Sequence, residues 1–164
     1  MPSTKARGTS SARTFAAKAA TACGIVASTA CSAIFCSAMA GSLEVSKAWT
    51  PPVSETGGNS PLLMTIRNNG EDADSLLRAR CPVANFIEKH TVDRGEGAPA
   101  MRAISSIAIP PNQTVTLNSG GFHLMLLQMR QVLAAGEHFV CSVSFAKAGS
   151  LDVEVVVASG ASGP

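Results

Sequence analysis

The sequence predicts an all-β protein folded as an antiparallel sandwich or barrel. Many short runs of apolar and β-branched residues follow one another after Gly41, separated by Pro, Gly and Asn. Strands do not alternate with helices, and the only weak 3.6-residue period lies in residues 129–135. The 164 residues are 46% hydrophobic and 15% charged, which provides enough apolar side chains for one packed core.

The first 40 residues have the pattern of a secretory signal peptide. Four basic residues precede an acid-free, largely apolar run over 19–40, and this run ends in the small-x-small sequence Ala38-Met39-Ala40. We therefore expect residues 1–40 to be removed and the mature protein to be exported. A buried helix or a membrane anchor is the alternative. A lipidated start at Cys31 or Cys36 has weak support, because the residues before each cysteine do not resemble a lipid-attachment motif.

One β-sandwich domain is expected over residues 41–157, followed by a small, polar and disordered tail over 158–164. Turn-rich segments are expected at 50–59 and 91–99, and Asn68-Asn69-Gly70 is typical of a hairpin turn. The predicted strand-like runs cover residues 43–46, 62–67, 75–80, 83–90, 101–109, 113–117, 122–129, 138–145 and 151–157.

Charge and cysteine content narrow the function classes. From Gly41 onward there are nine Lys or Arg against eleven Asp or Glu, a balance of −2, so a basic surface for nucleic acid is not expected. Only Cys81 and Cys141 remain after the leader, and neither belongs to a CxxC motif. They could form a disulfide worth about 4 kcal/mol in an oxidising compartment, or they could be two small buried apolar residues.

Two histidines and two methionines form the candidate metal site: His90, Met101, His123 and Met125. In a strand, residues at i and i+2 share one face. In the segment His123-Leu124-Met125, the side chains of His123 and Met125 can therefore both reach one ion. Imidazole and thioether are neutral donors that suit Cu(I) and, unlike thiols, do not form disulfides in an oxidising compartment. The alternative is that the methionines fill the core and the histidines are structural.

Other candidate residues have simpler explanations. Met64 and Met129 are expected in the core, and His138 is expected to be a solvated residue at the start of a strand. Three acidic residues flank the proposed site and could offer hard donors or lower the local potential, although a solvated loop is the simpler explanation: Glu88, Asp93 and Glu96. No nucleophile–histidine–acid arrangement and no phosphate-binding motif is present.

The spacing His90-x10-Met101-x21-His123-x-Met125 resembles the signature of the periplasmic PCu(A)C-type copper chaperones. The segments 48–52, 66–70, 81–84, 109–111, 120–126 and 145–149 are also similar to that family. The resemblance implies a cupredoxin-like antiparallel β-sandwich that binds one Cu(I) with those four side chains. It also implies delivery of copper to a respiratory site, such as the dinuclear copper centre of cytochrome oxidase, alongside a Sco-type partner.

The chain departs from the family pattern at three places. Many members have Met after the first histidine, where this chain has Thr91, and many have Arg where Thr50 stands. Some members carry a tail rich in His and Met that binds Cu(II). Residues 158–164 contain neither residue type, so a second copper site in the tail is not expected.

The sequence therefore predicts a monomeric Cu(I) carrier and not an enzyme. Its expected partner is a copper-accepting protein, either an oxidase subunit or a Sco-type protein, and this partner can be membrane-bound. Nucleic acid is not an expected partner. Three alternatives remain open: an extracytoplasmic copper storage or tolerance protein, an electron-transfer protein, and a metal-free interaction domain. A blue-copper site is disfavoured, because it needs a thiolate and no Cys lies close to the four candidate residues.

Overall fold

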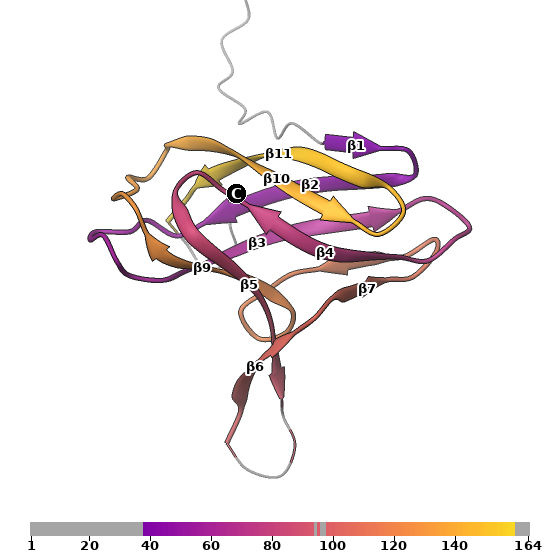
Figure 1. Cartoon of the computed structure of the whole chain (residues 1–164), viewed down its shortest axis with the longest axis horizontal. Helices are drawn as coiled ribbons and strands as arrows, with labels where there is room; N and C mark the ends of the chain where they lie inside the picture. Colours follow the sequence, from indigo (N-terminus) through magenta and orange to yellow (C-terminus); the bar gives the residue numbers. More distant parts are fainter. Residues whose placement is uncertain (1–37, 94, 96–97, 160–164) are drawn as a thin grey trace, which may run out of the picture. The chain divides into compact units, whose positions relative to one another are not determined.

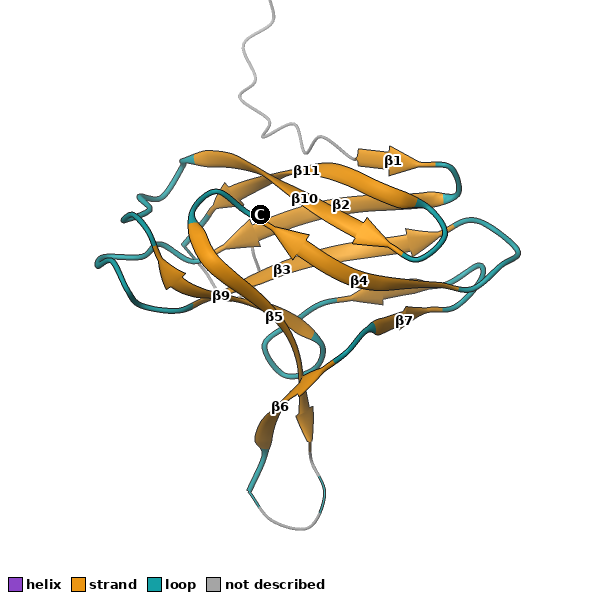
Figure 2. Ribbon diagram, in the orientation of Figure 1, coloured by secondary structure: helices purple, strands orange, loops and turns teal. Residues whose placement is uncertain are grey.

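The computed structural model describes residues 38–93, 95 and 98–159, and in this part of the chain every regular element is a strand (Figures 1 and 2). Residues 1–37 of the predicted signal peptide and residues 160–164 of the predicted tail lie outside the described residues. The strands are β1 (Ala38–Ala40), β2 (Leu43–Thr50), β3 (Ser60–Asn68), β4 (Asp74–Arg80), β5 (Ala84–Asp93), β6 (Ala100–Ile104), β7 (Ile107–Ile109), β8 (Thr114–Thr116), β9 (His123–Met129), β10 (His138–Phe145) and β11 (Gly149–Val157).

The strands form two sheets that share β3. One sheet has the order β6-β5-β9-β3, and the other continues as β3-β2-β11-β10-β4-β7, with β8 on β3 and β1 on β2. The short pairing of β11 with β2 is parallel, and all other pairs are antiparallel. The predicted fold class, a cupredoxin-like antiparallel β-sandwich, is confirmed.

The core lies between the two sheets and follows the period-2 alternation of the strands. In β9, Leu124 and Leu126 are fully buried, and in β11 the alternate residues Val153 and Val155 are buried in the same way. Met64 and Met129 are 1% and 2% exposed and belong to this core. Their predicted role as core residues is therefore confirmed.

Several predicted boundaries were wrong. Residues 91–93 were expected in a loop but extend β5, because they pair with β6. The run 101–109 is two strands, since residues 105–106 separate β6 from β7 and the two pair with different partners, β5 and β4. The weak helical period at 129–135 marks no helix. Instead Leu133 is buried and forms an isolated bridge with Val53.

Asn68-Asn69-Gly70 is not a hairpin turn, because β3 and β4 are not neighbours in the sheet. The Asn68 side chain is buried and donates from Nδ2 to the carbonyls of Asp72 and Ile109, at 2.8 and 3.3 Å. A Cβ at Gly70 would lie 2.7 Å from the Ser42 side chain. The turn residues therefore tie a loop onto its neighbours, where close approach requires glycine.

Cys81 and Cys141 form a disulfide, with 4.4 Å between their Cα atoms and a sequence separation of 60. Cys81 follows β4 directly and Cys141 lies in β10, the strand that pairs with β4. The sequence left open whether these cysteines form a disulfide or are two small buried apolar residues, and the structure shows the disulfide. The bridge fixes the end of β4 immediately before β5 begins.

Asp74 is a buried carboxylate that holds the β10–β11 turn. Its Oδ1 accepts from the backbone N–H of Ser75 and Lys147, at 2.7 and 2.9 Å, and its Oδ2 accepts from that of Ala148 at 2.9 Å. Burial raises the pKa of Asp74, but the backbone hydrogen bonds together outweigh burial and hold the pKa below its usual value. The ionised form is therefore the one that stabilises the fold.

Asp74→Asn is expected to lower the free energy of unfolding at pH 7 by about 2 kcal/mol, because an amide supplies one acceptor oxygen and no charge. The folded pKa lies below the unfolded one, so this contribution is complete above pH about 4 and lost as the pH falls through the folded pKa. Urea unfolding of both proteins at several pH values would check this. If the difference in unfolding free energy between the two proteins did not shrink at acid pH, the stabilising role of the ionised Asp74 would be contradicted.

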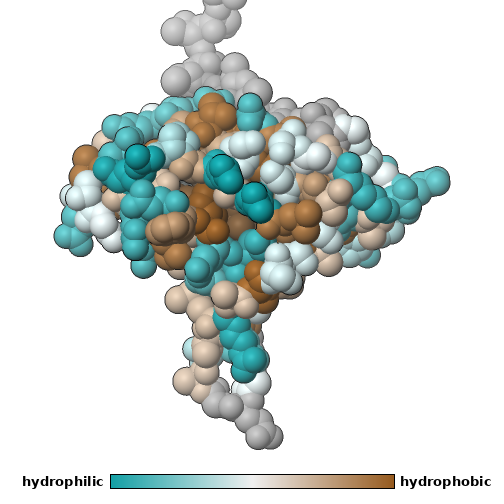
Figure 3. Space-filling view, viewed as in Figure 1, coloured by the Kyte–Doolittle hydropathy of each residue, from teal (hydrophilic) through white to brown (hydrophobic). Residues whose placement is uncertain are grey.

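The described residues contain no helix that is long and apolar enough to cross a membrane. On the face seen in Figure 3, hydrophilic surface is interrupted by smaller apolar areas over β4 and β5. In these two strands, Leu77 and Phe86 are 45% and 60% exposed. The hairpin formed by β5 and β6 extends away from the rest of the two sheets (Figure 1).

Candidate metal centre

The two candidate histidines lie side by side on adjacent strands. In the antiparallel register of β5 and β9, His90 is paired directly with His123. Their ring centroids are 5.6 Å apart, with 76° between the ring planes. Two imidazoles that bind one metal ion with bonds of about 2.0 Å and an angle of about 120° have centroids about 5.5 Å apart. The observed separation therefore fits a shared ion.

The two candidate methionines share the sheet face of the histidines. Met125 lies two residues after His123 on β9, and the alternation of the strand puts both on the face opposite the buried Leu124. On β6, Ala103 pairs with His90, so Met101, two residues earlier, lies on the same face at a diagonal position. The structure thus brings all four predicted residues to one face of three adjacent strands.

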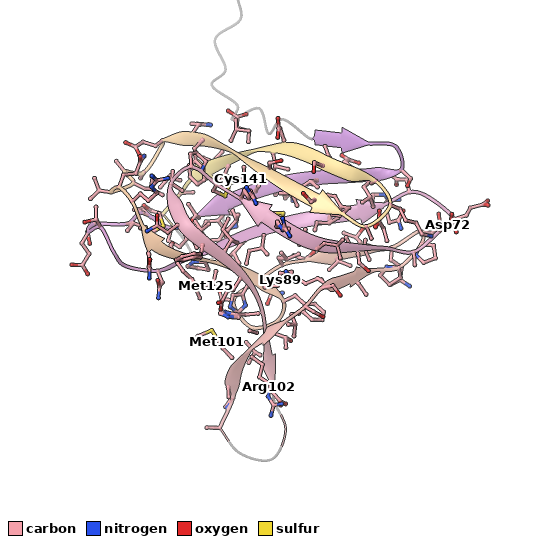
Figure 4. The ribbon with its side chains drawn as sticks, viewed as in Figure 1. Asp72, Lys89, Met101, Arg102, Met125 and Cys141 are labelled. Carbon is pink, nitrogen blue, oxygen red and sulfur yellow. A yellow bond between two sulfur atoms is a disulfide. The ribbon has the colours of Figure 1, made fainter. Side chains whose placement is uncertain are left out.

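Exposure varies strongly across the four side chains. His123 is 1% exposed, the His90 side chain is 14% exposed and Met101 is 61% exposed. Figure 4 shows Met101 at the base of the β5–β6 hairpin, below Met125 in that view. A ligand bound here would be held from a closed side by the histidines and would face solvent on the side of Met101.

Hydrogen bonds determine which nitrogen each histidine can offer. His123 Nδ1 lies 3.1 Å from the carbonyl oxygen of Gly121. A carbonyl can only accept, so Nδ1 carries the proton and Nε2 keeps the free lone pair.

His90 is held in the opposite tautomer. Its Nε2 lies 3.1 Å from Glu88 Oε2, and its Nδ1 is a buried atom without a hydrogen-bond partner among the described residues. A carboxylate accepts this bond, so the lone pair is on Nδ1. Burying an acceptor that remains unpaired costs about 1–3 kcal/mol, and a ligand that uses the lone pair removes this cost.

The donor set decides which metal the residues fit. Thioether sulfur is a soft donor that suits Cu(I), whereas zinc prefers Cys, His or carboxylate. In the part of the chain that the structure describes, no group of three or more His, Cys, Asp or Glu side chains could hold a metal ion, and both cysteines are in the disulfide. The four residues therefore fit Cu(I) better than zinc or a blue-copper centre.

Sequence reasoning missed the hydrogen-bond partner of His90. It preferred a solvated loop to a role beside the metal for Glu88, but Glu88 lies in β5, two residues before His90 and on the same face. The available signal was the spacing Glu-x-His inside a predicted strand, since residues at i and i+2 share a face. His138 lies at the start of β10, where its side chain is 52% exposed and its Nδ1 is 3.2 Å from Glu154 Oε1, as expected for a solvated residue.

The family model described as "Putative lipoprotein LpqE-like" matches residues 43–157. The chain belongs to the LpqE-like family. This LpqE-like chain is also 28% identical to "Putative lipoprotein Lxx21020" of Leifsonia xyli subsp. xyli (strain CTCB07) over 116 residues, which cover 70% of this chain and 69% of the relative.

Solved structures similar to the LpqE-like chain include PCuAC domains. The apo PCuAC domain from PmoF1 has a TM-score of 0.65 at 22% identity and covers 76% of this chain and 99% of its own. The copper-bound PCuAC domain from PmoF2 has a TM-score of 0.64 at 21% identity, and the match covers 76% of this chain and 98% of that domain. CuI-DR1885 from Deinococcus radiodurans has a TM-score of 0.55 at 22% identity, covering 68% and 76%. The expected resemblance to the PCu(A)C type is confirmed for the fold.

Proposed function

We propose that this protein is an extracytoplasmic copper chaperone that binds one Cu(I) through His90, Met101, His123 and Met125. The observation that carries the proposal is the pair His90–His123, whose hydrogen bonds leave one lone pair free on each ring. The two methionines on the same sheet face complete a neutral N₂S₂ donor set. The similar solved structures include one described as a copper-bound PCuAC domain and one described as CuI-DR1885, which supports the choice of metal.

The uneven exposure of the ligands suits a carrier better than an enzyme. Met101 is largely exposed, so an incoming donor from a partner can displace its sulfur while the buried His123 still holds the ion. Copper then moves by ligand exchange through a shared intermediate, with no bond of a substrate made or broken. A catalytic copper would in addition need an open position for a substrate, and the four donors already fill the coordination that Cu(I) requires.

Met101→Leu is expected to weaken Cu(I) binding about tenfold or more, or about 1.4 kcal/mol, without changing the fold, because the exposed side chain contributes little to the core. Competition with a Cu(I) chelator under anaerobic conditions measures the affinity. Met64→Leu is the matched control, since Met64 is 1% exposed in the core and should keep wild-type affinity. Equal affinity of the Met101→Leu variant and the wild type would remove Met101 from the site.

We further propose that the copper acceptor is a respiratory copper protein, such as the dinuclear copper centre of cytochrome oxidase or a Sco-type partner. The support is the resemblance to the PCu(A)C type. The test is transfer from the Cu(I)-loaded, monomeric protein to the purified apo copper domain of an oxidase, followed by the absorption of the dinuclear centre. Loaded protein that retains its copper in the presence of this acceptor would contradict the delivery role and leave a storage role.

We propose the division into a signal peptide at 1–40, a copper-binding domain at 41–157 and a tail at 158–164. The disulfide supports an oxidising compartment, and the curated relative is described as a putative lipoprotein. In the structure, β1 at Ala38–Ala40 pairs with β2, so removal of the leader after Ala40 also removes this edge strand. Mass spectrometry of the exported protein should find a mature chain that begins at Gly41. A lipid-modified cysteine at its start would replace this scheme with membrane attachment.

A further inference from the structure

Glu88 is the charged residue in contact with the proposed metal ligands. Its Oε2 lies 3.1 Å from His90 Nε2, and in the sheet register Glu88 is directly opposite Met125 on β9. Cross-strand partners have their side chains on one face, so the carboxylate lies within the ligand cluster. Its side chain is 52% exposed, while that of His90 is 14% exposed. The contact therefore joins a solvated carboxylate to a mostly buried imidazole.

The other charged groups of β5 and β6 are engaged elsewhere. Asp93 pairs with Arg102 at 3.1 Å, and the alternation of both strands puts this pair on the opposite face from His90. Lys89 also alternates to the other face and donates from Nζ to the carbonyl oxygen of Leu77. Within the described chain, the Glu88 carboxylate makes its side-chain hydrogen bond with His90.

We propose that Glu88 is a positioning residue for copper, an inference that rests on the proposed function. The carboxylate accepts the Nε2–H of His90 and so holds the tautomer in which the buried Nδ1 offers its lone pair to the ion. His123 is set by the neutral carbonyl of Gly121, so the two imidazoles bind through different nitrogens, Nδ1 of His90 and Nε2 of His123.

The second effect of Glu88 is electrostatic. His90, Met101, His123 and Met125 are neutral donors, so a bound Cu(I) ion keeps its full positive charge. A carboxylate one hydrogen bond away from a ligand balances part of this charge, and it stabilises Cu(II) more than Cu(I) because Cu(II) carries the larger charge. Because Glu88 is half exposed, solvent weakens this electrostatic effect. The fixed tautomer of His90 therefore makes the larger contribution to copper binding.

Two substitutions separate these effects. Glu88→Gln keeps an acceptor oxygen for Nε2–H but removes the charge, whereas Glu88→Ala removes both. We expect Glu88→Ala to weaken Cu(I) binding about 10–100-fold and Glu88→Gln to weaken it less. Both should raise the Cu(II)/Cu(I) potential. In the apo protein, long-range ¹H–¹⁵N NMR of the imidazoles should show Nε2–H for His90 in the wild type and in Glu88→Gln, and a mixture of tautomers in Glu88→Ala.

Glu154→Gln is the matched control. It removes the charge from the same kind of carboxylate–histidine contact at His138, 3.2 Å in length, and should leave Cu(I) affinity and potential unchanged. A wild-type tautomer and wild-type affinity in Glu88→Ala would overturn the inference. An unchanged potential in Glu88→Gln would overturn its electrostatic part. Failure of the wild type to bind Cu(I) would reject the proposed function instead, and the apo NMR comparison would still decide whether Glu88 fixes His90.

Discussion

Replacing His123 and Met125 together by Ala is expected to reduce bound Cu(I) from about one ion per chain to none. His123 is the most buried of the four proposed ligands, and Met125 lies two residues later on the same face of β9. Their loss leaves His90 and the exposed Met101, which lie on different strands, β5 and β6. Two neutral donors do not compete for Cu(I) with a strong chelator. Metal analysis after anaerobic loading and desalting gives the stoichiometry.

Loss of copper must be separated from loss of the fold, because His123 is fully buried. The His138→Ala variant is the matched control, since it removes an exposed histidine at the start of β10 and should keep one Cu(I) per chain. Circular dichroism of the double variant should retain the β spectrum of the wild type. A folded double variant that still binds one Cu(I) would show that the copper site lies elsewhere in the protein.

Replacing Cys81 and Cys141 together by Ala is expected to lower the free energy of unfolding by about 4 kcal/mol. The disulfide closes a 60-residue loop, and in the chain-entropy model its loss frees the unfolded chain by about that amount. Domains of this size are stable by about 5–15 kcal/mol, so the variant should be folded at 25 °C but close to its limit. Urea unfolding at equilibrium, with the wild type beside it, measures the difference.

The copper site provides an independent check on this variant. The disulfide joins β4 and β10 in one sheet, whereas the four proposed ligands lie in the other sheet, on β5, β6 and β9. We therefore expect the folded double-Ala variant to bind one Cu(I) with wild-type affinity. A midpoint of urea unfolding equal to that of the wild type would show that the bridge does not restrict the unfolded chain as assumed.

Local patterns in the sequence predicted most of the strands. The alternation in β9 and β11 is set by burial of one face, and a strand of that kind can be recognised from its own residues. The boundaries failed where pairing with a distant strand decided them. Residues 91–93 begin the polar, Gly-containing segment 91–99 but are held in β5 by β6, and Asn68-Asn69-Gly70 has turn residues but joins strands that do not pair.

The sequence by itself determined the kinds of donor, two imidazoles and two thioethers, and the shared face of His123 and Met125. These are properties of residue type and of alternation along a single strand. Only the tertiary structure decided that β5 lies beside β9 with His90 opposite His123, that Glu88 and Gly121 select the tautomers, and that Cys81 reaches Cys141. The physical reason is that strand register depends on the packing of segments far apart in the chain. A one-residue slip of a strand would turn its side chains to the other face of the sheet.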